Sequence, residues 1–371
     1  MKHINLFALT GICALLLLGC GQQTDSLPAT QAPAASTATE AASSSDAEPD
    51  TTAAESTASQ EEKPLETVKL RAAIPESLWG AYAPAIDAHE HYFAEEGLEI
   101  EWLKIFSGPT VAAGLISGDL DIGFTGPGGH TSSAAGSVQE VAFSHVGNSD
   151  AILVRTDPGI NSISDIVGKE IVTQAGTSGE VVLNLACQAN DIDKESLSIS
   201  YMDMTNAVAA FVAGHADVIA TSGKFARTLH EKLGDGVKEL CRVADFRDIA
   251  PTLGSFIATP EYIAENEDIV LRFIRALYRC IDYRSEQLDN TILYCAEWLE
   301  VDPEQMETER DNAVNYTVEE IIQACENGEM LQMYNAQFDQ FLLDGSVTEV
   351  KAYPEEYLRI DLMEKAYETY K

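Results

Sequence analysis

The sequence predicts an α/β protein of two lobes, with mainly parallel sheets, a cleft between the lobes and a set of helices at the C-terminal end. The first observation is a repeat, since Thr110–Gly126 and Asn206–Ser222 align without a gap. In each copy an Ala-rich helical run ends at a glycine (Gly118, Gly214), and a short apolar strand follows that ends in a threonine. Strand-like and helix-like segments also alternate up to Ala258, which is typical of parallel sheets. Finally, residues 65–371 are more than one core usually holds.

The first lobe is predicted to begin with a strand at Val68–Ile74. Apolar residues at helical spacing then predict a helix over Trp79–Glu96, with Gly97 as its C-cap. Leu98–Ile105 alternates apolar and charged residues, which favours a half-buried strand. The next elements are a helix that begins near Ser107-Gly108-Pro109, a strand at Leu120–Phe124, a small helix after Gly129, and strands at Val141–His145 and Ala151–Val154.

The second lobe opens near Ser164 and Asp165 and repeats this order. Its elements are a strand at Glu170–Thr173, a helix after Ser178, a strand at Leu197–Tyr201 and the second copy of the repeat. After Ala258 the pattern predicts helices only, with Thr259 as an N-cap and Pro260 in the first turn. Their apolar stripes, such as Ile269, Phe273, Leu277 and Ile281, are predicted to be core.

The N-terminal region is predicted to be a leader and a tether. Lys2 and His3 precede an apolar run that ends in Leu-Leu-Gly-Cys20, which is typical of an export signal over residues 1–20. The end of this run resembles the lipobox of bacterial lipoproteins, so Cys20 is expected to become a lipidated first residue that anchors the chain to a membrane. An ordinary cleaved signal or a buried helix is the alternative. Residues 21–64 consist of Ala, Ser, Thr, Gln, Pro and acids and predict a disordered acidic tether.

Charge and cysteine content exclude several partners. The net charge of −37 argues against nucleic acid and against attraction to anionic lipid headgroups. Five cysteines follow the tether, with no CxxC pair, so neither a metal nor a cofactor is expected and the thiols are predicted to be small buried apolar groups. Cys280 and Cys295 can face each other across a helical hairpin, and whether they are bridged stays open.

The candidate ligand site lies in the loops that follow the strands, because open parallel sheets bind ligands beyond the carboxyl ends of their strands. Two of these loops, Ser107–Thr110 and Gly176–Gly179, stand between a strand and a helix, where free N–H groups can receive an anion or a polar oxygen. Simple helix capping by the same hydroxyls is the alternative. The candidate ligand-binding residues of these and the equivalent loops are Ser107, Gly108, Pro109, Thr125, Gly126, Pro127, Thr177, Ser178, Gly179, Thr221 and Ser222.

Three larger side chains complete the candidate set. Trp79 can stack on a flat part of a ligand or plug the helix against the sheet. His130 can donate to a ligand from the first lobe, or serve as a cap or a solvent-exposed group. Lys224 is one of few cations in an acidic region and either meets the ligand or begins a helix in solvent.

Catalytic patterns are missing from the sequence. It contains neither a G-x-S-x-G elbow nor a Walker A motif, and His89-Glu90-His91 lacks the spacing of a zinc protease. We therefore expect no enzyme.

Several segments together resemble the substrate-binding proteins of ABC importers for nitrate, taurine, alkanesulfonates and the thiamine pyrimidine. The likeness covers most of the chain after the tether and runs through Phe93–Leu98, Phe106–Pro109, Ser117–Gly123, Ile163–Lys169, Gly176-Thr177, Gly214–Asp217 and Thr259–Tyr262.

The resemblance implies a type II periplasmic-binding-protein fold, whose two lobes close on a solute and dock on a membrane permease. We expect residues 65–157 and 254–371 to form lobe 1 and residues 158–253 to form lobe 2, with crossings near 155–160 and 250–255. The expected protein is a monomeric lipoprotein on the extracytoplasmic face of the membrane, and its partners are permease and ATPase subunits. Thr125 and Thr221, equivalent in the repeat, are candidate partners across the cleft.

The solute stays open, with a sulfonate, a nitrate-like anion, a pyrimidine or a similar small molecule as candidates. The loop Thr125–His130 is rich in glycine where many relatives carry bulkier residues, so the ligand cannot be transferred by analogy. An enzyme of pyrimidine or menaquinone precursor biosynthesis on the same fold, and a surface ligand sensor, are the alternatives.

Overall fold

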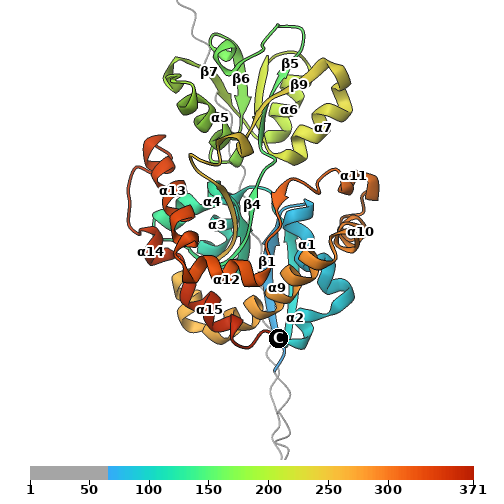
Figure 1. The fold of residues 1–371 in the computed structure, drawn as a ribbon, viewed down its shortest axis with the longest axis vertical. Coiled ribbons are helices and arrows are strands. Elements are labelled where there is room, and N and C mark those ends of the chain that lie inside the picture. Colours follow the sequence, from blue (N-terminus) through green and yellow to red (C-terminus); the bar gives the residue numbers. More distant parts are fainter. Residues whose placement is uncertain (1–65) are drawn as a thin grey trace, which may run out of the picture. The chain divides into compact units, whose positions relative to one another are not determined.

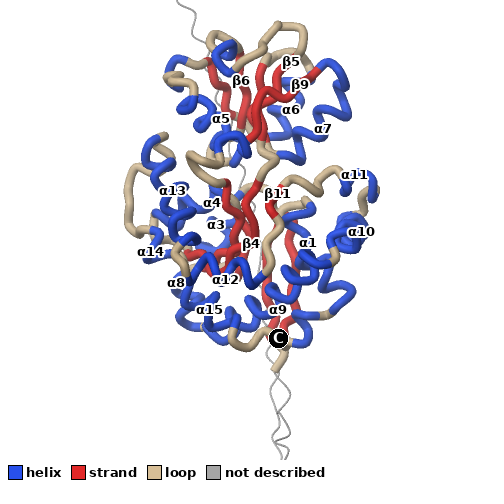
Figure 2. Tube along the Cα trace, viewed as in Figure 1, coloured by secondary structure: helices blue, strands red, loops and turns tan. Residues whose placement is uncertain are grey.

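The strands of the chain form two separate sheets, which we use to define two lobes. The computed structural model describes residues 66–371, so the predicted signal, tether and lipidated Cys20 lie outside the described residues. The first sheet has six strands in the order β11-β4-β10-β3-β1-β2, and the second has five in the order β7-β6-β8-β5-β9. Figure 1 shows helices covering both sheets, and Figure 2 separates helices from strands by colour.

The first lobe consists of the first sheet, helices α1–α4 and helices α8–α15. Its strands are β1 (Val68–Ile74), β2 (Leu98–Lys104), β3 (Ile122–Thr125), β4 (Gln139–Gly147), β10 (Thr252–Ala258) and β11 (Ala313–Val314). Its N-terminal helices are α1 (Leu78–Glu90), α2 (Tyr92–Glu95), α3 (Gly108–Ser117) and α4 (Pro127–Ala134). Its C-terminal helices are α8 (Pro260–Glu265), α9 (Glu267–Glu286), α10 (Leu288–Leu299), α11 (Pro303–Glu307), α12 (Val318–Glu326), α13 (Glu329–Leu343), α14 (Pro354–Tyr357) and α15 (Ile360–Tyr367).

The second lobe is smaller. Its strands are β5 (Ala151–Arg155), β6 (Glu170–Thr173), β7 (Ser198–Tyr201), β8 (Val218–Thr221) and β9 (Val237–Arg242). Its α-helices are α5 (Ser178–Ala189), α6 (Met204–Val212) and α7 (Gly223–Leu233). The predicted two-lobed α/β fold is confirmed, but the prediction of mainly parallel sheets is wrong. Within residues 66–371, four strand pairs are parallel and five are antiparallel, so both sheets are mixed. β9 was not foreseen, and neither was β11, which lies in the region where only helices were predicted.

The sequence repeat extends to the topology of both sheets. The parallel set β3-β1-β2 of the first sheet has the same order as β8-β6-β7 of the second. The repeated helix and strand are α3 and β3 in one lobe and α6 and β8 in the other, and Gly118 and Gly214 both follow the helix with positive φ of 77° and 78°. The carboxyl ends of three parallel strands therefore meet at one edge of each sheet.

The first strand after each crossing between the sheets, β5 or β10, is antiparallel to the parallel strands of the sheet that it joins. β5 pairs antiparallel with β8, and β10 pairs antiparallel with β3. β5 enters the second sheet directly after β4 leaves the first, so the first crossing lies at 148–150, and the prediction that residues 151–157 belong to lobe 1 is wrong. A strand that arrives from the cleft begins where its neighbours end and must therefore point the opposite way.

Two helix boundaries differ from the predicted ones. The helix expected over Trp79–Glu96 is broken at His91, which adopts a left-handed φ of 61° and closes α1 with a hydrogen bond to the Asp87 carbonyl. The Asp87 carboxylate then accepts from the Phe93 amide and begins α2. α4 starts at Pro127 rather than after Gly129, because Pro127 suits the first turn of a helix. Gly128, Gly129 and His130 are thus helical.

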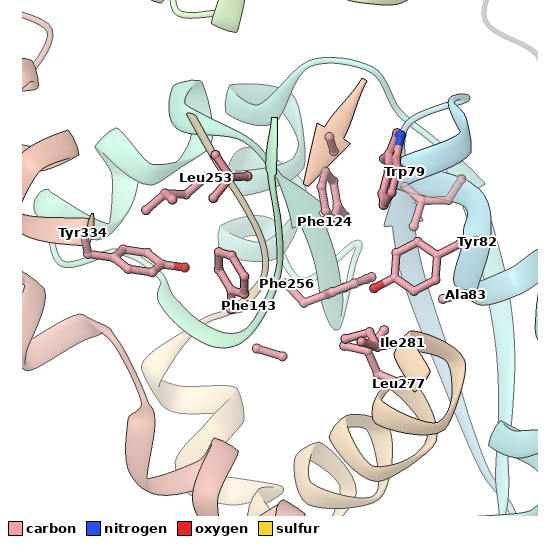
Figure 3. Close-up of a cluster of buried hydrophobic side chains, with 14 of the residues drawn as sticks. Trp79, Tyr82, Ala83, Phe124, Phe143, Leu253, Phe256, Leu277, Ile281 and Tyr334 are labelled. Carbon is pink, nitrogen blue, oxygen red and sulfur yellow. The ribbon is translucent and has the colours of Figure 1, made fainter. Parts of the chain in front are cut away.

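The main core lies between the first sheet and the C-terminal helices. Phe143 of β4, Phe256 of β10 and Ile281 of α9 are fully buried there, as Figure 3 shows. Cys280 and Cys295 are both free and buried, and their thiols contact the carbonyl oxygens of Ala83 and Leu78 on α1. The pairing of these two cysteines therefore does not form. Within residues 66–371, no helix is long and apolar enough to cross a membrane, and no cluster of His, Cys, Asp or Glu has the arrangement of a metal site.

Candidate functional site

A cavity of about 150 Å³ lies where the strand ends of both lobes meet. The first lobe contributes the loops after β1, β2 and β3, and the second lobe contributes the loops after β6 and β8. The lining residues are Pro75, Glu76, Ser77, Trp79, Phe106, Gly108, Phe124, Gly126, Pro127, Gly128, His145, Gly147, Ser149, Asp150, Gly176, Thr177, Ser178, Ser222, Gly223, Lys224, Thr252, Leu253, Gly254, Glu309 and Asn312. A solute in this space is within reach of both lobes.

Aromatic rings form the wall on the first lobe. Trp79 stands in the first turn of α1, and its ring centroid lies 5.7 Å from that of His145. Phe124 at the end of β3 stacks on His145, with 5.5 Å between ring centroids. The Trp79 indole N–H donates to the Glu309 carbonyl over 2.8 Å, so the ring offers its face rather than its donor to a solute. Trp79 and Phe124 are both labelled in Figure 3.

The polar groups of the second lobe come from helix starts. The Ser178 hydroxyl at the start of α5 donates to Asp150 Oδ1 over 2.9 Å, while the Thr177 hydroxyl donates to the Gln174 carbonyl. Burial raises the pKa of Asp150 to about 6, although the bond from Ser178 works in the opposite direction. The Ser222 hydroxyl before α7 is buried and has no hydrogen-bond partner among the described residues.

Two ion pairs join the lobes at the rim of the cavity. Lys224 of α7 lies 2.8 Å from the Glu76 carboxylate, and this bond lowers the pKa of Glu76. Arg227, one turn further along α7, contacts Glu309, whose other oxygen accepts from the Leu78 amide over 2.7 Å. These contacts hold α7 against the first lobe.

The opposite side of the cavity is closed by backbone contact. Gly128 of α4 lies so close to Gly176 that a Cβ on Gly128 would collide with the Gly176 carbonyl. Nearby, the Asn184 side-chain amide of α5 donates to the Asp344 carboxylate over 2.6 Å. The two lobes therefore touch on both flanks of the cavity.

Eight of the predicted ligand-binding residues line this cavity, and six do not. The structure brings together Trp79, Gly108, Gly126, Pro127, Thr177, Ser178, Ser222 and Lys224. The residues outside the lining are Ser107, Pro109, Thr125, His130, Gly179 and Thr221.

The six residues support the walls from behind or border the space outside them. Thr125 and Thr221 are buried at the ends of β3 and β8, where their hydroxyls contact the Gly126 carbonyl and the Met204 sulfur, so they do not face each other across the cleft. Gly179 lets α5 pack on β8, since a Cβ there would lie 2.7 Å from the Ala220 carbonyl. Ser107 is the N-cap residue of α3, and Pro109 borders a neighbouring depression beside Gly176.

His130 points into the first lobe rather than into the cavity. The imidazole is fully buried, and its Nδ1 lies 2.7 Å from Gln337 Oε1 of α13. Because burial disfavours the charged form, the pKa of His130 falls to about 4. The helical conformation of Gly128 and Gly129 turns this side chain away from the cleft.

Several lining residues were missed by the sequence reasoning. Asp150 lies at the first crossing, which was expected further along the chain, and His145 lies near the end of β4, outside the loops considered. Glu309 and Asn312 follow α11 in the C-terminal region, which was interpreted as packing only. A signal existed for Asp150, because Gly147-Asn148-Ser149-Asp150 is a polar break between two apolar strands.

The fold is that of periplasmic binding proteins. The chain is similar to the alkanesulfonate-binding protein SsuA from Xanthomonas axonopodis pv. citri bound to MOPS, with a TM-score of 0.62 and 19% identity over 77% of this chain and 96% of that chain. The desulfurization enzyme DSZB is also similar, with a TM-score of 0.60 and 12% identity over 82% of this chain and 99% of that chain. Both binding proteins and an enzyme thus share this architecture.

The family follows from the sequence comparison. The model of the family described as NMT1/THI5 like matches residues 81–291, so the chain belongs to the NMT1/THI5-like family. A Brucella abortus protein that carries the provisional name of a binding protein is 28% identical over 282 residues, which is 76% of this chain and 88% of its own length. The taurine-binding periplasmic protein of Escherichia coli is 24% identical over 197 residues, 52% of this chain and 60% of its own length.

Proposed function

We propose that this chain is the extracytoplasmic solute-binding component of an ABC importer. The observation that carries the proposal is the cavity itself, whose walls come from the strand ends of both lobes. A solute held there contacts both lobes at once, so it stabilises the closed form by contacts that an open form lacks. A permease with its ATPase subunits then receives the solute from the closed protein.

The relatives support this proposal. The Brucella abortus relative is named for binding and the Escherichia coli relative for binding taurine in the periplasm. The SsuA structure contains a bound sulfonate buffer, MOPS. We therefore place the solute among small organic molecules that reach the outside of the cytoplasmic membrane.

We propose binding rather than catalysis. His145 is the histidine in the cavity wall, and burial followed by the nearby Arg284 charge lowers its pKa to about 3. Its Nδ1 also lies 3.0 Å from the Ser144 hydroxyl. A group with so low a pKa is a weak general base near neutral pH.

We also propose that a lipid on Cys20 anchors the protein to the membrane. The support is the Leu-Leu-Gly-Cys20 sequence after an apolar run. Cys20→Ser is expected to move the protein from the membrane fraction to the soluble fraction. Retention of the variant in the membrane would argue against the anchor.

The solute can be found by purifying the protein from cells without denaturation and releasing bound small molecules for mass spectrometry. The wild type is expected to carry a solute that Ser178→Trp lacks, because the larger indole side chain at this position would fill the cavity. Ser200→Trp is the matched control, because Ser200 is exposed on β7 of the same lobe. A solute that is equally abundant on all three proteins, or on none, would contradict the proposal.

A further inference from the structure

The cavity wall contains one carboxylate without a cationic partner in residues 66–371. Three carboxylates line the space, and two of them are neutralised, Glu76 by Lys224 and Glu309 by Arg227. Asp150 forms no ion pair among these residues and is met by the Ser178 hydroxyl. The one lysine in the wall is therefore already occupied, while one negative charge is free.

Asp150 is buried and its backbone is fixed by a hydrogen bond. The residue is 7% exposed, lies between the end of β4 and the start of β5, and has its backbone carbonyl bonded to the Val243 amide. Burial raises its pKa to about 6, so the carboxyl is mostly ionised at neutral pH. A buried carboxylate with one neutral donor gains much from a cationic donor, because charge-assisted hydrogen bonds are the strong ones.

A second unsatisfied group lies in the same wall. The Ser222 hydroxyl is buried without a partner in the described residues, and Ser222 lines the cavity. Buried polar groups in native proteins are nearly always hydrogen-bonded. A hydroxyl of this kind can accept from, or donate to, a second polar atom of a solute.

The rest of the cavity wall suits a flat apolar body. Trp79 offers its ring face, and Phe106 and Phe124 line the same space. Phe106 is itself held edge-on by Phe225 of α7, with ring centroids 5.0 Å apart. Aromatic walls of this kind favour stacking on an unsaturated ring.

The fully buried cation Arg284 is not part of the cavity wall. It lies behind Trp79, 5.0 Å from the ring centroid. Its Nε donates to Asn315 and its Nη2 to the Ser144 carbonyl, while Nη1 has no hydrogen-bond partner among the described residues. An anionic solute would thus be separated from Arg284 by the indole and would meet Asp150 directly.

We propose that the solute is a flat organic molecule that carries a protonated nitrogen of the amine or amidine type, with this nitrogen donating to Asp150 and the ring lying against Trp79. This inference rests on the proposed solute-binding function and narrows it. It sets the chain apart from relatives named for sulfonates, because a sulfonate would face the unpaired Asp150 carboxylate.

The test compares pairs of aromatic probes that have the same ring and opposite charge. Benzamidine is paired with benzenesulfonate, and benzylamine with phenylmethanesulfonate, in thermal-shift and calorimetric titrations of the wild type and Asp150→Asn. The amidine or the amine is expected to raise the melting temperature of the wild type, and the sulfonates are not. Asp150→Asn is expected to weaken binding of the cationic probes about tenfold or more, because the charge is lost while the amide oxygen still accepts from Ser178.

Other results overturn the inference. The inference is wrong if a sulfonate binds in preference to its cationic partner, or if Asp150→Asn binds the cationic probes as well as the wild type does. It is also wrong if neither class of probe stabilises the protein. If Asp150→Asn is misfolded by circular dichroism, Ser222→Ala serves as the second variant, with a several-fold loss of affinity expected for the cationic probes and an unchanged affinity contradicting the inference. A solute recovered from native protein would still support the solute-binding function in any of these cases.

Discussion

The imidazole Nε2 of His130 lies 3.3 Å from Oε2 of Glu140, and both side chains are fully buried. Burial raises the pKa of Glu140 to about 8 and lowers that of His130 to about 4, so at neutral pH the acid holds its proton and the imidazole is neutral. The Ser133 hydroxyl donates to Glu140 over 2.7 Å. His130 and Ser133 both belong to α4, whose first turn lines the cavity.

Stability is expected to fall as pH rises through about 8. A carboxyl whose folded pKa is raised above its unfolded value stabilises the fold at low pH, and that contribution is lost as pH rises to the folded pKa. Glu140→Gln cannot ionise, so its advantage over the wild type should grow up to about pH 8 and then level off in urea unfolding. Glu286→Gln, at an exposed position on α9, is the control. Parallel pH profiles for wild type and Glu140→Gln would contradict the expectation.

Gly128→Ala is expected to weaken solute binding about tenfold or more without unfolding the protein. A Cβ at this position collides with the Gly176 carbonyl of the other lobe, so the lobes cannot come together as they do here. Gly236→Ala is the control, because Gly236 lies outside the cavity wall and its Cβ would have no neighbour closer than 3.8 Å. Calorimetric titration with the recovered solute measures both variants, and equal affinities would show that this contact does not limit closure.

The two ion pairs between the lobes are expected to differ in their effect on stability. Glu309→Ala leaves Arg227 and the Leu78 amide without their acceptor in a buried place and should cost about 3 kcal/mol. Lys224→Ala removes a half-exposed pair and should cost less than about 1 kcal/mol. Chemical denaturation provides both free energies of unfolding. Equal costs would mean that burial does not decide the strength of these pairs.

Cys280 and Cys295 are expected to react as free thiols. Alkylation of the unfolded protein without a reductant, followed by peptide mass spectrometry, should label both residues, because each thiol contacts α1 rather than the other cysteine. The melting temperature should also be unaffected by reductant. A disulfide-linked peptide pair would refute the free state.

The fold was predictable from the sequence because its signals are local. The repeat of helix, glycine and strand is visible at Gly118 and Gly214, and the strands alternate with helices in a regular order. β9 was missed because Val237–Arg242 alternates only weakly between apolar and charged residues. The first crossing was misplaced because β4 and β5 are both apolar. The sequence of β5 alone does not indicate that it pairs with β8.

The cavity was predictable in part. Five of the six loops after the parallel strands line one cavity, since the carboxyl ends of parallel strands lie at one edge, whereas the loop after β7 does not reach it. The direction in which a side chain points depends on where its helix starts, and a shift of α4 to Pro127 moved His130 into the core. Glu309 lies in the cavity wall and contacts Arg227 of α7. The residues next to Glu309 in the sequence do not indicate this tertiary contact.

The chain leaves the first sheet after β4 and returns to it with β10, and this has a consequence for the order of folding. β10 lies between β3 and β4 and pairs with both, yet it follows β4 by roughly 100 residues, after the whole second sheet. Until residues 252–258 are in place, β4 has no bond to β3, and the first sheet remains in two pieces. Contacts so distant in the chain slow folding. A nascent chain that ends between residues 242 and 252 therefore contains every strand of the second sheet but lacks β10 of the first.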